Sequence, residues 1–146
     1  MVIDMQKVLL TIKGMNISDG ETDLVEFVTE GRLFVKANGY LLEYDESELT
    51  GEEGVTTQVL LEGASVTLSR NGEIDTHMVF EENQVFESNV STPFGMVHMN
   101  IMAHHIDSSL SELSGSLDLE YEVSTDDMST MNKLFLSFKR VDNRVN

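Results

Sequence analysis

Apolar and polar residues alternate along most of this chain, and this period of two constrains the fold more than any other feature. The pattern covers LVEFVTE (24–30), LFVKA (33–37), YLLEYD (40–45), TQVLLE (57–62), SVTLSR (65–70), IDTHMVF (74–80), QVFES (84–88), LDLEYEV (117–123) and KLFLSFK (133–139). Successive side chains of a β-strand point to opposite faces, so each segment predicts a strand with one buried face. Strands near residues 6–14 and 96–104 bring the candidates to about eleven.

The connections between these segments are short, and nothing in the chain is typical of a linker. There is a single proline, Pro93, and no tract rich in serine and glycine. Short strands joined by close turns predict a sandwich or a barrel, and closure into a barrel removes the exposed edges that promote aggregation. We therefore expect one all-β domain over residues 1–146. Its predicted architecture is an antiparallel meander that closes into a barrel of about eight to ten strands.

The first of two Asn-Gly dipeptides predicts a tight hairpin. A two-residue loop of Asn38 and Gly39 is typical of a primed turn. It would place only apolar residues opposite one another, in the pairs Ala37–Tyr40, Val35–Leu42 and Leu33–Tyr44. One clean face of this hairpin is then directed inward.

The second Asn-Gly dipeptide favours a longer loop. A two-residue loop of Asn71 and Gly72 would place Leu68 opposite Asp75, an apolar residue against a charge. A three-residue loop that includes Arg70 restores apolar matching, in the pairs Leu68–Ile74, Val66–Thr76 and Ala64–Met78. We expect this three-residue loop, with glycine in the left-handed conformation and a bulge.

The longest connection is expected at HHIDSSLSELSGS (104–116). Ile106, Leu110 and Leu113 fall at helical spacing there, after a possible cap at Asp107. The pattern predicts at most one short helical turn, which would cover one end of the barrel.

The order of several elements resembles that of a known family. These elements are VLLTIKG (8–14), LVEFVTEGRLFVKANGYLLEYDE (24–46), SVTLSRNGEI (65–74) and TPFG (92–95). Over nearly the whole chain they are similar to the YwiB-like family of uncharacterised bacterial proteins, and this resemblance implies a calycin, lipocalin-like β-barrel. Asn83 stands where that family pattern leads us to expect glycine, and asparagine tolerates the left-handed conformation. The resemblance implies no catalytic residues.

The charge balance narrows the range of partners. The chain has 26 acidic and 9 basic residues, a net charge of −17. Such a surface repels the phosphate backbone of nucleic acids and anionic membranes, so we expect neither as a partner. The excess of acids suits either a basic protein partner or simply a well-solvated surface.

Three further features indicate a cytoplasmic protein. The chain has no cysteine, which excludes disulfides and cysteine-based zinc sites. No apolar run approaches the roughly 20 residues that a membrane-spanning helix needs. The N-terminal sequence MVIDMQKVLL lacks a basic start followed by an apolar stretch, so we expect no secretion signal.

The stretch GMVHMNIMAHHID (95–107) invites a search for a soft-metal site. On a helix Met96, Met99 and Met102 would share a face, whereas on a strand Met99 points away from the other two. Met96 and Met102 would then lie on the order of 20 Å apart, too far for one ion. A site would need His98 together with a neighbouring strand, for instance at His77. We expect no metal and no cofactor, with methionine as core filler and histidine as a surface residue.

Signatures of catalysis are missing from the sequence. There is no G-x-S-x-G elbow, no phosphate-binding glycine loop and no H-E-x-x-H motif. The paired carboxylates Glu52-Glu53, Glu81-Glu82 and Asp126-Asp127 are expected at turns, and a chain with 26 acids contains such pairs by chance. An enzyme is therefore the less favoured class.

Three residues are candidates for binding a ligand at the rim of the barrel. Arg70 continues the inward row of Val66 and Leu68 to the end of its strand, where it would meet a carboxylate or phosphate group. The alternative is a turn arginine paired with Glu73 or another surface acid. Tyr40 and Tyr44 share the inward row of the preceding hairpin, and they either line a cavity or belong to the core.

Two functions follow from this sequence. The favoured one is a non-catalytic module that holds a small, largely apolar ligand inside the barrel. The alternative is an interaction protein with a filled core, which binds a basic protein through its acidic outer surface. An internal cavity with polar groups at its mouth would favour the first.

Overall fold

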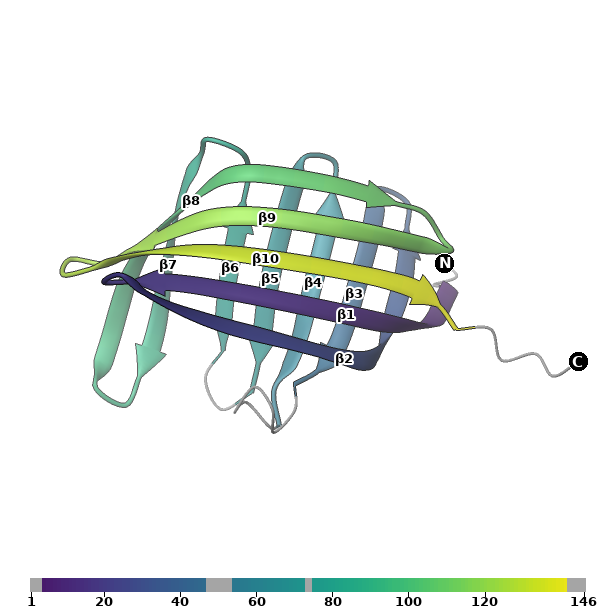
Figure 1. Cartoon of the computed structure of the whole chain (residues 1–146), viewed down its shortest axis with the longest axis horizontal. Helices are drawn as coiled ribbons and strands as arrows, with labels where there is room; N and C mark the ends of the chain where they lie inside the picture. The colour runs from purple at the N-terminus through teal and green to yellow at the C-terminus, as the bar shows by residue number, and fades with distance from the viewer. Residues whose placement is uncertain (1–3, 47–53, 73–74, 142–146) are drawn as a thin grey trace, which may run out of the picture.

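The computed structural model describes residues 4–46, 54–72 and 75–141. Within these ranges the chain forms one antiparallel sheet of ten strands and contains no helix (Figure 1). The strands are β1 (Asp4–Ser18), β2 (Glu21–Lys36), β3 (Gly39–Asp45), β4 (Thr56–Glu62), β5 (Ser65–Asn71), β6 (Thr76–Phe80), β7 (Val85–Thr92), β8 (Gly95–Leu110), β9 (Ser114–Ser124) and β10 (Ser129–Arg140). The predicted all-β, antiparallel architecture of about eight to ten strands is confirmed.

The sheet curls into a nearly closed barrel. Its strand order is β6-β5-β4-β3-β2-β1-β10-β9-β8-β7, so the pairing of β1 with β10 joins the two ends of the chain. The outermost strands, β6 and β7, follow one another in sequence and meet at a seam. There the backbone N–H of Asn83 donates to the carbonyl of Ala103 at 2.9 Å, and the Ser88 hydroxyl donates to the carbonyl of His77 at 2.8 Å.

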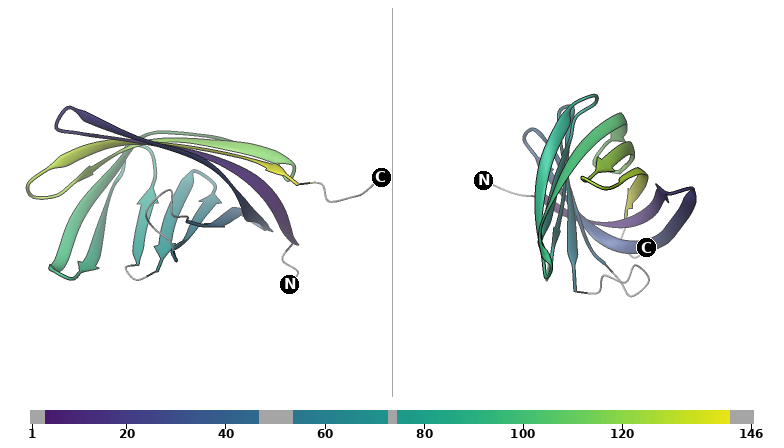
Figure 2. Two further views of the ribbon diagram at one scale, coloured as in Figure 1. Left: turned by 60° about the horizontal axis from the view of Figure 1, so that its bottom comes forward. Right: turned by 90° about the vertical axis from the view of Figure 1, so that its left-hand side faces the viewer.

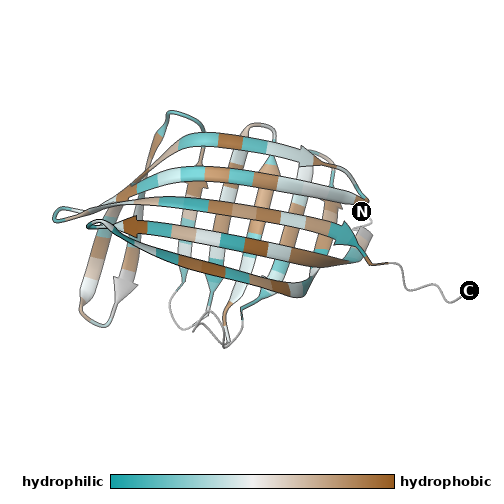
Figure 3. Ribbon diagram, in the orientation of Figure 1, coloured by the Kyte–Doolittle hydropathy of each residue, from teal (hydrophilic) through white to brown (hydrophobic). Residues whose placement is uncertain are grey.

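Two sets of strands cross one another around the core. The long strands β1, β2, β8, β9 and β10 run across β3 to β6 at a steep angle, and the views of Figure 2 show the space between them. The interior is filled by the inward rows of both sets. The buried core is Val8, Leu10, Ile12, Phe27, Leu33, Leu42, Tyr44, Val59, Leu61, Val66, Leu68, Phe80, Ile101, Ala103, Leu117, Leu119, Leu136 and Phe138. Hydropathy alternates along single strands, as the period of two requires (Figure 3).

Two of the eleven predicted strands are in fact one strand, β2. The expected strands at 24–30 and 33–37 are one continuous strand, Glu21–Lys36, because β1 pairs with it from Ser18–Glu21 to Asp4–Val35. Gly31 lies in this strand and not in a turn. A Cβ at Gly31 would collide with the side chain of Leu10 and would lie 2.8 Å from the carbonyl oxygen of Glu43. The glycine therefore permits a close approach of strands, although in the sequence pattern it indicates a break.

The β2–β3 hairpin has the predicted inward face but a different register. Leu33 pairs with Leu42 and Val35 with Tyr40, in place of the predicted Leu33–Tyr44 and Val35–Leu42. The two loop residues are Ala37 and Asn38, not Asn38 and Gly39. The shift of two residues keeps each side chain on its predicted face, so apolar matching does not distinguish the two registers. Gly39 lies so close to the carbonyl of Leu61 that no Cβ fits, and this contact accounts for the glycine.

The β5–β6 hairpin has a longer loop than predicted. Leu68 pairs with Met78 and Arg70 with Thr76, in place of Leu68–Ile74 and Val66–Thr76. Ile74 lies outside the described residues. The backbone N–H of Gly72 donates to Asp75 at 3.1 Å, which holds the wider loop. The inward face is again as predicted, because the register differs by an even number of residues.

The predicted helical turn after His104 is wrong. Strand β8 continues to Leu110 and joins β9 through a short turn in which Ser111 N–H donates to Ser114 at 2.9 Å. A β-bulge between Ala103 and His105 changes the phase of the strand, so inward residues are odd-numbered up to Ala103 and even-numbered from Ile106. Ile106 and Leu110 thus lie four residues apart on one strand face, and their helical spacing is coincidental.

Among the residues that the structure describes, two turns contain left-handed residues other than glycine. Asn83 has φ of 63°, so it adopts the left-handed conformation that asparagine tolerates. The β1–β2 turn contains Asp19 with φ of 50° and Gly20 with φ of 79°. Asp-Gly between alternating segments is a signature of a type I′ hairpin, so this turn has a local signal in the sequence.

Candidate functional site

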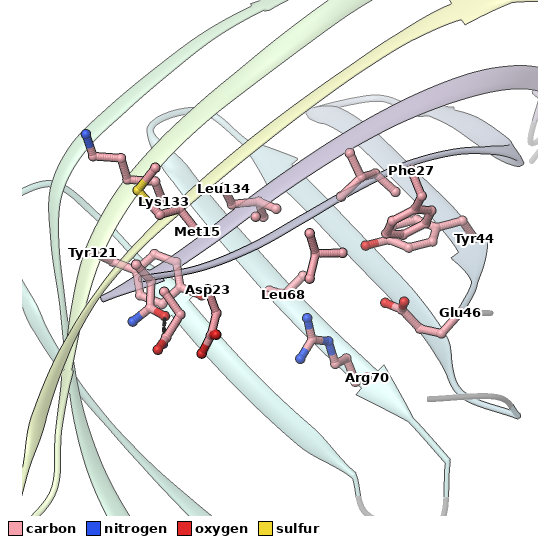
Figure 4. Close-up of a pocket in the computed structure, with 15 residues that line it drawn as sticks. Met15, Asp23, Phe27, Tyr44, Glu46, Leu68, Arg70, Tyr121, Lys133 and Leu134 are labelled. Carbon is pink, nitrogen blue, oxygen red and sulfur yellow. Dashed lines mark hydrogen bonds between the residues drawn. The ribbon is translucent and has the colours of Figure 1, made fainter. Parts of the chain in front are cut away.

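A pocket of about 290 Å³ opens at one end of the barrel (Figure 4). We call it the barrel-end pocket. On one side it is bounded by the last part of β1 and β9 and the first part of β2 and β10. On the other side it is bounded by the last part of β3 and β5. It is lined by Ile12, Gly14, Met15, Asn16, Asp23, Val25, Phe27, Tyr44, Glu46, Leu68, Arg70, Tyr121, Asn132, Lys133 and Leu134.

The inner wall of the pocket is apolar. Ile12, Phe27 and Leu68 are buried core residues that also face the pocket, and Leu134 packs against the same core. The rings of Phe27 and Tyr44 meet edge to face, with centroids 6.3 Å apart. Each of these residues lies on the inward row of its strand, so the alternation that builds the core also builds this wall.

One side of the pocket has a compact polar group. Glu46 directly follows β3 and is only 8% exposed, and the buried Thr57 hydroxyl donates to its carboxylate at 2.7 Å. The Tyr44 hydroxyl and the Arg70 guanidinium lie on this same side of the pocket (Figure 4). An apolar cavity thus has a cation, a carboxylate and a phenol at its margin.

The tyrosine hydroxyls of the pocket stay protonated at neutral pH. Burial raises the pKa of Tyr44 far above its ordinary value, with the Glu46 carboxylate acting in the same direction and Arg70 opposing it. Burial also raises the pKa of Tyr121, and Arg70 again opposes the shift. The positive charge of Arg70 therefore acts on the pKa of both tyrosines. The protonated Tyr44 hydroxyl is hydrogen-bonded within the polar group, to the side chains of Glu46 and Thr57.

The structure separates the three predicted site residues. Arg70 and Tyr44 both line the barrel-end pocket, as the inward row predicted. Tyr40 does not. It lies four residues from Tyr44 on β3, about 13 Å along the strand, and it packs against the core beside its partner Leu61. The alternative pairing of Arg70 with Glu73 involves a residue outside the described ranges.

Several pocket residues were not predicted from the sequence. Glu46 continues the inward row of Leu42 and Tyr44, and Tyr121 continues that of Leu117 and Leu119, so alternation could have identified both. The ring of Tyr121 also packs against that of Phe80 in a tilted arrangement, with centroids 4.7 Å apart. The amide of Asn16 donates to Asn132 across β1 and β10 at 2.6 Å, and no local signal identifies that pair.

The Met- and His-rich stretch is strand β8, as the period of two predicted. Ile101 and Ala103 are buried, whereas Met96 is 69% exposed. The four histidines have different partners. His77 contacts Ser69 at 3.1 Å, His98 contacts Asn89 at 2.7 Å, His104 contacts Glu122 at 3.3 Å, and His105 lies 4.0 Å from Glu82. In the described parts of the chain no three metal-ligating side chains of His, Asp or Glu are grouped so that they could hold an ion.

The two carboxylate pairs that the structure describes, Glu81-Glu82 and Asp126-Asp127, do not line the pocket. Glu82 accepts a hydrogen bond from the backbone N–H of Ile106 at 2.8 Å, a structural contact at the barrel seam. Asp126 and Asp127 are exposed in the turn between β9 and β10. Glu52 and Glu53 lie outside the described residues.

Comparison with known proteins identifies the family. A family model described as a domain of unknown function, DUF1934, matches residues 10–136. The chain belongs to this family. Its DUF1934 region includes all or part of every strand, and the match extends across the pocket-lining positions, including Tyr44, Glu46 and Arg70.

A relative of this DUF1934 protein has a solved structure. The chain is 26% identical over 120 residues to the "Uncharacterized beta-barrel protein YwiB" of Bacillus subtilis, a match that covers 82% of this chain and 83% of the relative. The crystal structure of the Bacillus subtilis ywiB protein matches with a TM-score of 0.83 at 20% identity, over 96% of each chain. The structural match shows a shared β-barrel fold, and the predicted resemblance to the YwiB-like family is confirmed. The described residues include no helix of the length and apolarity needed to cross a membrane.

Proposed function

We propose that the barrel-end pocket binds a small, largely apolar ligand that has an anionic or hydrogen-bond-accepting end. The observation that carries this proposal is the combination of an apolar wall with a few polar groups at the margin, which is the usual composition of a ligand site. The volume of about 290 Å³ is close to the lower end of the range of roughly 300–1,000 Å³ for such sites, so the ligand is small.

The polar margin supports an orientation for this ligand. The guanidinium of Arg70 suits a carboxylate or phosphate group, since it offers several N–H donors in one plane. Tyr44 adds a protonated hydroxyl on the same side of the pocket. The apolar part of the ligand would contact Ile12, Leu68 and Leu134. The side chain of Lys133 runs away from the interior in Figure 4, so we assign it no role in binding.

The implied membership of the calycin, lipocalin-like class also supports this function. Barrels of about eight strands have an interior that side chains fill or that holds one small ligand. This chain has a core that is packed over most of the barrel and a pocket at one end, which suits a small ligand.

Native mass spectrometry tests the proposal on protein purified from its own host without denaturation. We expect a non-covalent small-molecule adduct on the wild-type chain. The adduct should be lost in Leu134→Trp, which fills the pocket from a half-buried position on β10. Leu110→Trp is the matched control, because Leu110 is also half-buried but lies at the far end of β8. Bare protein in all three samples would contradict the proposal.

A further inference from the structure

The first half of β2 is an open sheet edge. Residues 21–30 pair with β1 on one side, but β3 pairs with β2 only from Gly31 to Lys36. None of the strands that the structure describes pairs with the other side of residues 21–30. In Figure 1 this segment is the outermost strand of the front layer. We call residues 21–30 the free β2 edge.

The side chains of the free β2 edge are unusual for an exposed edge. Leu24 is 70% exposed, Val28 is 59% exposed and Val25 is 42% exposed. Large apolar side chains on an open edge promote pairing with another strand, and proteins normally avoid them there. The polar residues of this edge include four acids, Glu21, Asp23, Glu26 and Glu30, and no base.

We propose that the free β2 edge binds an extended, basic segment of a partner protein by β-strand addition. In this mode the main chain of the segment supplies hydrogen bonds to the edge, and alternate side chains supply specificity. Val25 and Phe27 lie on the inward face of the edge and suit apolar side chains of the segment, whereas Glu26 and Glu30 lie on the outward face and suit lysine or arginine. The net charge of −17 also attracts a basic partner over longer distances.

A second copy of this chain is the less suitable occupant. Four of the ten residues 21–30 are acidic, so two such edges paired with each other would place carboxylates near carboxylates. Like charges opposite one another on neighbouring strands are destabilising. The charges of the edge therefore select against self-pairing while they favour a basic segment.

This inference goes beyond the pocket proposal and does not depend on it. Asp23, Val25 and Phe27 belong to the free β2 edge and also line the barrel-end pocket. An added strand would thus run along the mouth of the pocket. A pocket-filling variant, Leu134→Trp, should still bind the segment, which separates failure of one proposal from failure of the other.

Hydrogen exchange measured by NMR on the folded protein provides the test. The probe is a short peptide that alternates lysine with valine, and the control peptide replaces each lysine with glutamate. We expect the lysine peptide to slow amide exchange within residues 21–30, where pairing would protect backbone N–H groups. Glu26→Lys should weaken binding roughly fivefold, the upper end for one cross-strand charge pair. Glu26→Gln should give a smaller loss.

A matched pair of variants separates edge binding from general attraction to acidic protein. Leu24→Lys and Leu113→Lys add the same charge at similarly exposed leucines, 70% and 65% exposed. Leu24→Lys should weaken binding of the peptide, and Leu113→Lys should not. Equal weakening by both would overturn the proposal. Slowed exchange elsewhere, equal binding of the glutamate peptide, or protection of the edge without peptide at high protein concentration would also overturn it.

Discussion

The Tyr44 hydroxyl should make the stability of this protein depend on alkaline pH. Its pKa in the folded state is raised above the ordinary value of 10.0, first by burial and then by Glu46. A raised folded-state pKa means that the stabilising contribution is complete below about pH 10 and is lost as the pH rises toward the folded-state pKa. We expect the free energy of unfolding to fall above about pH 10, measured by urea denaturation.

The variant Tyr44→Phe provides the control for this pH dependence. It has no phenolic proton to lose, so its stability should fall less steeply over the same range. If the free energy of unfolding fell equally steeply with pH in wild type and Tyr44→Phe, the raised folded-state pKa of Tyr44 would be contradicted.

A second residue-scale prediction concerns Glu43 on the outer face of β3. The side-chain amide of Gln58 donates to its carboxylate at 2.7 Å, and Arg32 donates to its other oxygen at 2.7 Å. These contacts lower the pKa of Glu43 below its ordinary value of 4.5, against the effect of burial. Gln58→Leu removes the largest cause, so the pKa of Glu43 should rise.

The pKa of Glu43 is measured by NMR titration of its side-chain carboxyl carbon. Thr56→Val is the control, because Thr56 donates to Asp45 at 3.0 Å and not to Glu43. Since the folded-state pKa is lowered, the contribution of Glu43 to stability is present above about pH 4.5 and is lost at lower pH. Gln58→Leu should flatten this loss. An unchanged Glu43 titration in Gln58→Leu would contradict the assigned cause.

At the residue scale, alternation predicts the face on which each side chain lies but not its position along the barrel axis. Arg70 and Tyr44 are correctly placed on inward rows, and both line the pocket. Tyr40 lies on the same inward row as Tyr44 but near the opposite end, because a period of two repeats along the whole strand. Which end opens depends on how the two sets of strands cross, and no single segment contains that information.

At the element scale, Gly31 makes the clearest prediction. Gly31→Ala should destabilise the protein by about 1–3 kcal/mol, the typical cost of overpacking. The added Cβ would meet the Leu10 side chain and the backbone oxygen of Glu43. Gly14→Ala is the matched control on the adjoining strand, because no atom lies within 4 Å of its Cβ position. It should be neutral or slightly stabilising.

Urea denaturation of both glycine variants checks this prediction. Equal stability of Gly31→Ala and Gly14→Ala would contradict the close approach of β1, β2 and β3 at Gly31. A loss confined to Gly31→Ala would explain why this strand contains a glycine at a position where the sequence pattern indicates a break.

The existence of the strands is readily predicted from the sequence, whereas their boundaries and registers are not. Both predicted hairpin registers are wrong by an even number of residues, because every even shift preserves apolar matching. The bulge at Ala103 and His105 reverses the phase of β8, so Ile106 and Leu110 face inward. Their spacing of four residues fits one face of a strand as well as one face of a helical turn. Registers and bulges depend on partner strands that are distant in the sequence.

At the scale of the whole molecule, the net charge of −17 should make stability depend on salt. Unscreened repulsion between acids destabilises the compact state, and salt screens it. We expect the thermal unfolding midpoint to rise by about 2–8 °C between low and moderate sodium chloride, equivalent to roughly 1 kcal/mol. Sucrose at matched osmolality is the control, and a fall in the midpoint with salt would contradict the prediction.

The barrel itself can be predicted from the sequence, because nearly every segment alternates and the connections are short. The sequence leaves two alternatives for the interior, a ligand pocket and a filled core, because inward apolar residues form the same pattern around a ligand as around each other. The structure adds the location of the opening and the polar group of Tyr44, Glu46 and Arg70 beside it. A filled core and an open end coexist in one barrel.

The most direct test of the pocket is a methyl NMR titration with octanoate, a small apolar probe with a carboxylate end. We predict chemical-shift changes at Ile12, Leu68 and Leu134, which line the barrel-end pocket, and none at Leu61 and Val66 near the other end. Arg70→Gln should weaken octanoate binding about tenfold, as expected for loss of a charge-assisted contact. Changes spread evenly over the barrel, or no changes at any concentration, would contradict a ligand site at this end of the molecule.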